Sequence, residues 1–109
     1  MVNKRRGEIA AELDGKQWKL CLTLGALAEL ESAFDAADLV ALGARFSTGK
    51  LSAKDMIAVI TAGLRGGGHE VETSNVSNMQ ADGGLTQLAD IVVRLLSATF
   101  GESTPTPNP

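Results

Sequence analysis

The sequence predicts an α+β domain in which an N-terminal two-stranded antiparallel β-hairpin packs on a mainly α-helical body. Two observations support this fold class. The dipeptide Asp14-Gly15 separates two segments of alternating polarity, which is the pattern of a tight hairpin. After the hairpin, apolar residues recur at intervals of three and four, which is the pattern of amphipathic helices. We expect three main helices and one or two short ones.

The predicted hairpin agrees in its turn and in its side-chain alternation. Asp and Gly tolerate the positive φ angles of a two-residue type I′ turn, and with that turn Leu13 lies opposite Lys16. This register places the apolar residues of both strands on one side of the ribbon: Ile9, Ala11, Leu13, Trp18 and Leu20. The other side receives Glu8, Ala10, Glu12, Gln17, Lys19 and Cys21. A slip of one residue would move one apolar set to the wrong side, so both features support this register.

A helix is expected directly after the hairpin, because two strands alone are only marginally stable in water. Thr23 is its predicted N-cap, and we expect it to end near Ala37. Its apolar residues recur at helical spacing: Ala26, Leu27, Leu30, Ala33 and Phe34. A second, short helix is predicted after Asp38, with Gly49 at its C-terminal end. Its apolar positions are Leu39, Leu42 and Phe46.

The clearest helix start is at Ser52, which forms a predicted capping box with Asp55. Leu51 precedes the cap and is expected to pack on Met56 as a hydrophobic staple. The predicted buried stripe of this helix comprises Met56, Ile57, Ile60 and Leu64. Arg65 lies where the helix dipole favours a cation, and the glycines 66–68 end the helix.

Residues 69–82 are polar, and two interpretations stay open for them. One is a short helix from about Asn75 to Gln80, anchored by Val76 and Met79, and the other is a plain loop. The dipeptide Gly83-Gly84 then precedes the longest helix, residues 85–100, which Gly101 closes.

The chain is long enough for one domain, which we place at residues 7–101. Residues 1–6 are expected to form a flexible N-terminus, and residues 102–109, with all three prolines, a disordered tail. The single cysteine, Cys21, excludes an internal disulfide and suits a reducing compartment. No signal peptide and no long apolar run is visible, so we expect a cytoplasmic chain that does not enter a membrane.

No chemical site is predicted. One histidine and one cysteine in different elements do not make a metal site, and His69, after three glycines, is expected to be a solvated loop residue. The glycine run closes a helix, whereas a phosphate loop opens one. Cys21 is interpreted as a small packed thiol, with a reactive thiol as the alternative if it is exposed. We therefore expect neither an enzyme nor a cofactor.

The charged residues also predict no chemistry. The pairs Glu29/Glu31 and Glu70/Glu72 are interpreted as solvated faces, because residues two apart on a helix point in different directions. A net charge of −3 gives no reason to expect a nucleic acid, and the basic cluster at residues 4–6 is interpreted as a solvated end.

The last helix has more apolar surface than one packing face needs. At about 100° per residue, its apolar side chains cover about 200° of the helix. One interpretation is a central helix that other elements contact on several sides. The other leaves one margin, either Ile91 with Leu95 or Val93 with Phe100, as a contact for another chain.

Five segments resemble small proteins encoded in the tail-gene region of gene transfer agents and related tailed phages. Their motifs are an N-RRGE start, an L-DG hairpin, LTLGALAELE, a KLS-x-D helix start and a closing ATFG. In this sequence they are Asn3 with Arg5 to Glu8, Leu13 to Gly15, Leu22 to Glu31, Lys50 to Asp55, and Ala98 to Gly101. The resemblance covers roughly residues 3–101, but residues 69–81 follow no pattern of the family.

This resemblance implies a tail morphogenesis protein with no catalytic residues. It implies a tail assembly chaperone that binds the tape-measure protein in the bacterial cytoplasm; the alternative is a structural tail-tube component associated with the particle. The expected partners are therefore tail proteins, with a homo-oligomer left open. A small DNA-binding regulator is a third, less favoured interpretation.

Overall fold

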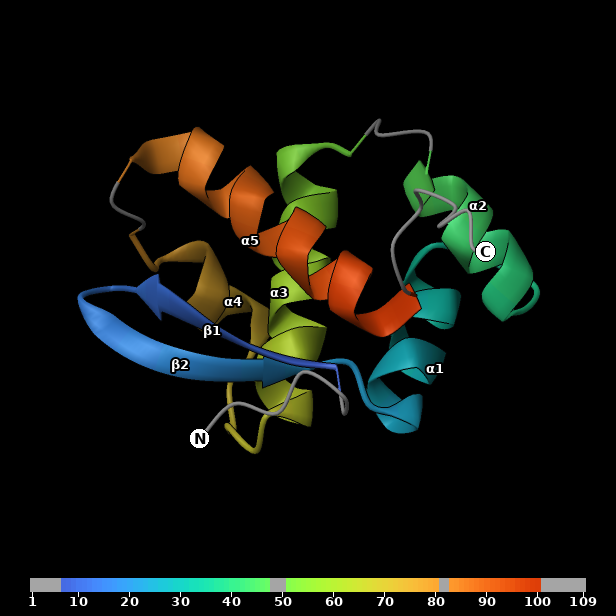
Figure 1. Cartoon of the computed structure of the whole chain (residues 1–109), viewed down its shortest axis with the longest axis horizontal. Helices are drawn as coiled ribbons and strands as arrows, with labels where there is room; N and C mark the ends of the chain where they lie inside the picture. The colour runs from blue at the N-terminus through green and yellow to red at the C-terminus, as the bar shows by residue number, and fades with distance from the viewer. Residues whose placement is uncertain (1–6, 48–50, 81–82, 101–109) are drawn as a thin grey trace, which may run out of the picture.

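The computed structural model confirms the α+β class, and it describes residues 7–47, 51–80 and 83–100. Two strands are followed by five helices (Figure 1), and the elements in chain order are β1 (Glu8–Leu13), β2 (Lys16–Cys21), α1 (Leu24–Ala33), α2 (Leu39–Ser47), α3 (Ala53–Gly66), α4 (Thr73–Ser77) and α5 (Gly84–Phe100). The predicted flexible ends 1–6 and 102–109 lie outside the described residues, as do the two predicted helix-ending glycines 49 and 101.

The hairpin has the predicted turn and register. Asp14 and Gly15 both have positive φ angles, 57° and 76°, as a type I′ turn requires. Leu13 pairs with Lys16, and the remaining pairs follow in step to Glu8 opposite Cys21. The predicted polar side is covered at the open end of the hairpin, where both Glu8 and Cys21 are buried.

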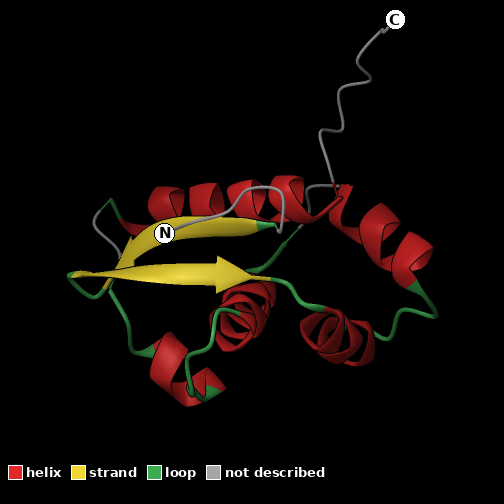
Figure 2. Cartoon of the chain, turned by 60° about the horizontal axis from the view of Figure 1, so that its bottom comes forward, coloured by secondary structure: helices red, strands yellow, loops and turns green. Residues whose placement is uncertain are grey.

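Helix α3, and not the last helix, is the central element of the body. It contacts β2, α1, α4 and α5, whereas α5 packs on the hairpin and α3. Figures 1 and 2 show α1 and α2 at one end of the molecule and the hairpin turn with α4 at the other, while α5 spans both ends. Because α3 is contacted from several sides, Val59 and Ala62 are buried together with the predicted Ile60 and Leu64.

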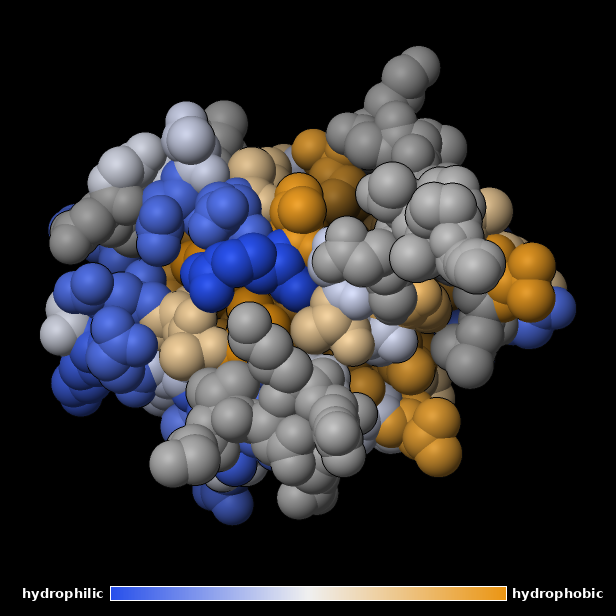
Figure 3. Space-filling model, viewed as in Figure 1, coloured by the Kyte–Doolittle hydropathy of each residue, from blue (hydrophilic) through white to orange (hydrophobic). Residues whose placement is uncertain are grey.

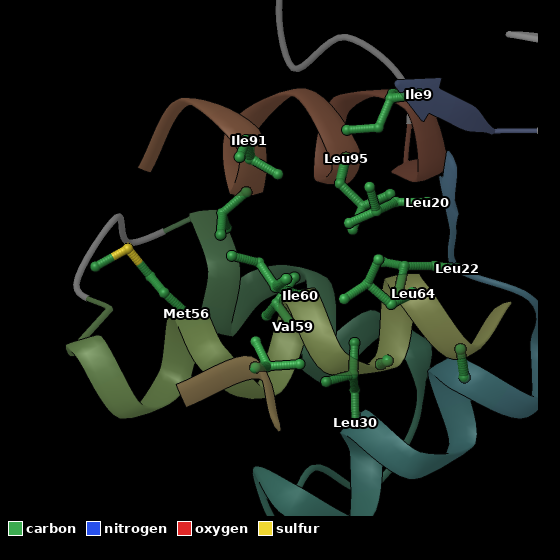
Figure 4. Packing of buried hydrophobic residues seen from close by; sticks show 14 of the residues in the cluster. Ile9, Leu20, Leu22, Leu30, Met56, Val59, Ile60, Leu64, Ile91 and Leu95 are labelled. Carbon is green, nitrogen blue, oxygen red and sulfur yellow. The ribbon is translucent and has the colours of Figure 1, made fainter. Parts of the chain in front are cut away.

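The core forms where the apolar side of the hairpin meets α3, α5 and α1 (Figure 4). Leu20 of β2 points toward Leu64 of α3 and Leu95 of α5, and Leu30 of α1 approaches α3 from the opposite side. The largest fully buried side chains are Leu13, Leu20, Leu30, Leu42, Val59, Ile60, Leu64, Ile91, Val92 and Leu95.

The glycines at the end of α3 allow a close approach of helix and strand. A Cβ atom on Gly66 would overlap the carbonyl oxygen of Cys21, and one on Gly67 would overlap that of Lys19. Their role therefore extends beyond the helix-ending function predicted from the sequence. They let the C-terminal turn of α3 lie directly against the backbone of β2.

Three of the five predicted helices begin at their predicted caps. Thr23 Oγ1 accepts a hydrogen bond from the backbone N–H of Ala26, Asp38 Oδ1 accepts one from Ala41, and Ser52 forms the reciprocal capping box. The fourth helix, α4, begins earlier than predicted, at Thr73. The reason is that Asn75 turns its side chain back, and its Oδ1 accepts the N–H of Glu72.

The predicted end of α1 near Ala37 is wrong. The helix ends at Ala33, and Phe34 is its C-cap residue. Asp35 then adopts a left-handed conformation with φ 55°, which a helix cannot continue through. The chain turns there toward α2.

Candidate functional site

The described residues hold no cluster of His, Cys, Asp or Glu side chains that could bind a metal ion. The thiol of Cys21 is buried, in agreement with the packed interpretation. The expectation of a solvated His69 is wrong, because this side chain is half-buried against Trp18. The two rings meet edge to face with centroids 4.9 Å apart, and His69 Nε2 is buried with no hydrogen-bond partner among residues 7–47, 51–80 and 83–100. This edge contact is a packing feature of the loop after α3.

One carboxylate from each predicted pair has an ionic partner, and both of these carboxylates are exposed, as the interpretation of solvated faces predicts. Arg65 at the end of α3 lies 3.1 Å from a carboxylate oxygen of Glu29 and 3.4 Å from one of Glu72. Its Nε also donates a hydrogen bond to the carbonyl oxygen of Val71. Arg65 therefore connects α1, α3 and the segment before α4. These groups are exposed, so we assign them a structural role of modest energy.

The remaining candidate surface lies on α5. Its two predicted margins differ in how far their side chains are buried. Ile91 and Leu95 are completely buried, and Figure 4 shows them pointing into the core toward α3 and the hairpin. These two side chains are therefore not available to another chain in this fold. Val93 is 60% exposed and Phe100 is 40% exposed, so of the two predicted margins this second one is the accessible one.

The division of α5 follows its helical geometry. At about 100° per residue, the buried residues Ile91, Leu95 and Val92 span about 100° of the helix surface. Angles are counted around the helix from Ile91. The part from about 140° to about 200° carries four apolar side chains that we call the α5 seam: Ala89, Val93, Leu96 and Phe100. The two inner members of the seam, Ala89 and Leu96, are half-buried. The last helix thus buries one part of its apolar surface in the core. In the other part Val93 and Phe100 stay exposed, while Ala89 and Leu96 pack partly against the core.

The polar side of α5 is directed toward the hairpin. Arg94 forms an ion pair with Asp90 at 3.0 Å and donates a hydrogen bond of 2.9 Å to the carbonyl oxygen of Ala10 in β1. These are the only charged residues of α5. Their pairing fixes the rotation of the helix and leaves the α5 seam without charge.

Aromatic contacts join the end of the α5 seam to α2 and α1. The ring of Phe100 lies 6.3 Å from that of Phe46, which meets Phe34 edge to face at 5.2 Å. A Cβ atom on Gly43 of α2 would come within 4.0 Å of the Phe100 ring. The α2 face with Gly43 is therefore next to the C-terminal end of the seam.

Two other large apolar side chains are exposed in the part of the chain that the structure describes, Leu24 at the start of α1 (80%) and Val40 near the start of α2 (82%). Val40 precedes Gly43 by one helical turn, so it lies on the α2 face that meets Phe100. Figure 3 shows hydrophobic surface gathered toward the end with α1 and α2, and hydrophilic surface toward the end with the hairpin turn. The predicted apolar positions of this helix, Leu39, Leu42 and Phe46, already leave Val40 out. Periodicity alone does not show that Val40 lies near the end of α5.

Comparison with protein families gives one result that covers nearly the whole chain. The model of a family described as "Phage tail tube protein, GTA-gp10" matches residues 6–102. Neither the curated proteins nor the solved structures gave a match. No helix among residues 7–47, 51–80 and 83–100 is long and apolar enough to cross a membrane.

Proposed function

Because the chain belongs to the phage tail tube protein, GTA-gp10 family, and is therefore a phage-type tail-region protein, we propose that it is a tail assembly chaperone that binds the tape-measure protein. In this role it covers apolar segments of the tape-measure protein in the bacterial cytoplasm until tube subunits assemble around them. The role needs a binding surface and no reactive group.

The exposed apolar margin of α5 is the observation that carries this proposal. Val93 and Phe100 remain accessible although the same helix buries Ile91, Val92 and Leu95. Fully burying a side chain of this size contributes about 1.5–3 kcal/mol. A chain that leaves such groups in water retains that free energy for a partner.

The arrangement of these groups favours a chaperone over a tube subunit. A subunit of a closed ring contacts its neighbours through two different surfaces on opposite sides. Here Val40 of α2 and Val93 and Phe100 of α5 are exposed. The hydrophobic surface gathers toward the end with α1 and α2 (Figure 3). The opposite end, with the hairpin turn, is hydrophilic. This asymmetry fits a protein that binds one partner and is then released.

The proposal is tested by co-expressing the chain with the tape-measure protein from the same tail-gene region. We expect the tape-measure protein to remain in the supernatant and to co-purify with the tagged chain. Mass spectrometry of purified particles from producing cells should then detect the tape-measure protein and no stoichiometric amount of this chain. Aggregation of the tape-measure protein with and without the chain would overturn the proposal.

A structural tail-tube component is the second candidate, and the description of the family favours it. This candidate predicts the opposite result in the same experiment. The chain would be found in purified particles in many copies, and it would not retain the tape-measure protein in solution.

A further inference from the structure

We propose that the α5 seam and Val40 together bind a single α-helix of the partner, one with an apolar stripe flanked by lysine or arginine. The inference rests on the proposed function and specifies which surface acts and what chemistry it selects. Three observations support it: the spacing of the residues in the α5 seam, the charge of residues 24–47, and the position of Val40.

The spacing of the α5 seam is that of a helix-pairing surface. Its members follow one another at intervals of four, three and four residues, from Ala89 through Val93 and Leu96 to Phe100. Alternating intervals of three and four place side chains in one row along a helix, where they interlock with the equivalent row of a facing helix. An extended strand has a period of two and would not match this row. The matching occupant is therefore a helix with the same 3–4 spacing.

Val40 extends this surface onto α2. Phe100 at the end of the seam is close to Gly43, and Val40 is one turn away on the same side of α2. Gly43 has no side chain that would separate a docked helix from Phe100. A partner helix that follows the seam toward its C-terminal end thus meets Val40 next.

The acidic residues that precede Val40 in the sequence favour a basic partner. Residues 24–47 contain four acidic residues and one basic residue. The one arginine, Arg45, is placed over the ring of Phe34, 5.2 Å from its centroid. Glu31 and Asp35 have no ionic partner among the residues that the structure describes, and Asp38 immediately precedes α2. Lysine or arginine beside the partner's apolar stripe would complement this acidic rim.

The same charges disfavour a second copy of this chain as the occupant. Two copies that met through this surface would bring their acidic rims together, and the whole chain has a net charge of −3. Like charges opposed across an interface reduce affinity. A partner of opposite charge satisfies both the apolar seam and its rim.

Binding of overlapping 30-residue synthetic peptides from the tape-measure protein tests the inference. We expect the wild-type chain to select peptides with 3–4 apolar spacing and lysine or arginine on the flanks. Val93→Gln should weaken binding about tenfold or more, because it places an amide in the centre of the apolar contact. Val40→Gln should weaken it in the same direction.

The matched control is Leu24→Gln, which replaces an equally exposed apolar residue at the start of α1. This variant should bind within about twofold of wild type, below the effect of a central contact residue. Circular dichroism melting verifies that all three variants fold, since each changes an exposed position. If Val93→Gln, Val40→Gln and Leu24→Gln all bind as wild type does, the seam is overturned while the chaperone role stands. If Leu24→Gln binds the peptides as weakly as Val93→Gln does, the α5 seam with Val40 is not the binding surface. Failure of wild type to bind the full-length tape-measure protein overturns both.

The acidic rim has its own test. The double variant Asp35→Asn and Asp38→Asn removes two charges, while asparagine retains the left-handed conformation at one position and the helix cap at the other. At low ionic strength it should bind the selected peptides roughly threefold to tenfold more weakly, and the difference should fade as salt screens the charges. Glu12→Gln with Glu70→Gln, two exposed sites on β1 and in the loop after α3, should leave binding unchanged. Equal binding by the rim variant and wild type at low salt would contradict the basic flank.

Discussion

The hairpin end and the α1–α2 end of this molecule use apolar residues in opposite ways. At the hairpin, Leu13 and Leu20 are completely buried, and α3 lies against the strand backbone. At the other end, Leu24 and Val40 stand in water and Phe100 is only partly covered. Helix α5 belongs to both regions, since it buries Leu95 under the hairpin (Figure 4). The same helix exposes Val93.

This difference shows that exposure is a property of an element's surroundings and not of its composition. A helix with an apolar arc of about 200° is fully covered only if neighbours exist on both sides. In this chain α3 occupies the centre, so α5 lies at the periphery, and one side of it is left uncovered by residues 7–47, 51–80 and 83–100. Stability and binding can therefore be separated by substitutions on a single helix.

The largest expected effect is loss of stability from the buried side of α5. Leu95→Ala should lower the free energy of unfolding by about 2–5 kcal/mol, because it removes a completely buried side chain and leaves a cavity beside Leu20 and Leu64. The urea midpoint of unfolding measures the change.

Leu24→Ala is the matched control for Leu95→Ala, since it deletes the same atoms from a leucine that is 80% exposed. Its free energy of unfolding should change by less than about 0.5 kcal/mol. If both variants lost stability equally, the two ends of the molecule would not differ in packing, and the comparison would fail.

The second expected effect concerns the contact of α3 with β2. Gly66→Ala introduces a Cβ atom where the carbonyl oxygen of Cys21 lies, so helix and strand must separate. We expect a loss of about 1–3 kcal/mol in the free energy of unfolding. Gly25→Ala is its control, because Gly25 lies within α1 and the nearest atom to an added Cβ is 3.9 Å away. That change should stabilise the chain by about 0.5–1 kcal/mol through helix propensity. Unchanged stability of the Gly66 variant would remove the argument for backbone contact.

The hairpin and the starts of α1 and α3 could be predicted from the sequence because their determinants are local. The turn dipeptide, the alternation and the caps at Thr23 and Ser52 act over a few residues, and each is found where it was predicted. The end of α1 could not be placed, since it depends on the conformation of Asp35, which several residue types can adopt. Local signals thus defined element starts better than element ends.

The candidate surface could be predicted only in outline. Periodicity identified the broad apolar arc of α5 and its two margins, but the choice between Ile91 with Leu95 and Val93 with Phe100 depends on which side meets α3. That packing is set by contacts distant in sequence, such as Arg94 with the carbonyl of Ala10. The same reason explains why the joint approach of Glu29 and Glu72 to Arg65 was not foreseen.

The smallest expected effect is at this exposed arginine, which connects the two regions through α1 and the segment before α4. Glu29→Gln removes the closer of its two ion pairs, in which the glutamate side chain is 53% exposed. The free energy of unfolding should fall by less than about 0.5 kcal/mol, because water and salt screen an exposed pair and ordering two long side chains costs entropy. Urea unfolding at low and high ionic strength measures the contribution of this ion pair. The difference in the free energy of unfolding between the variant and wild type should shrink as the salt concentration rises. A loss above 1.5 kcal/mol that salt does not reduce would show that Arg65 holds the two regions together. The stability of the α1–α2 end would then depend on this contact and not on its aromatic packing.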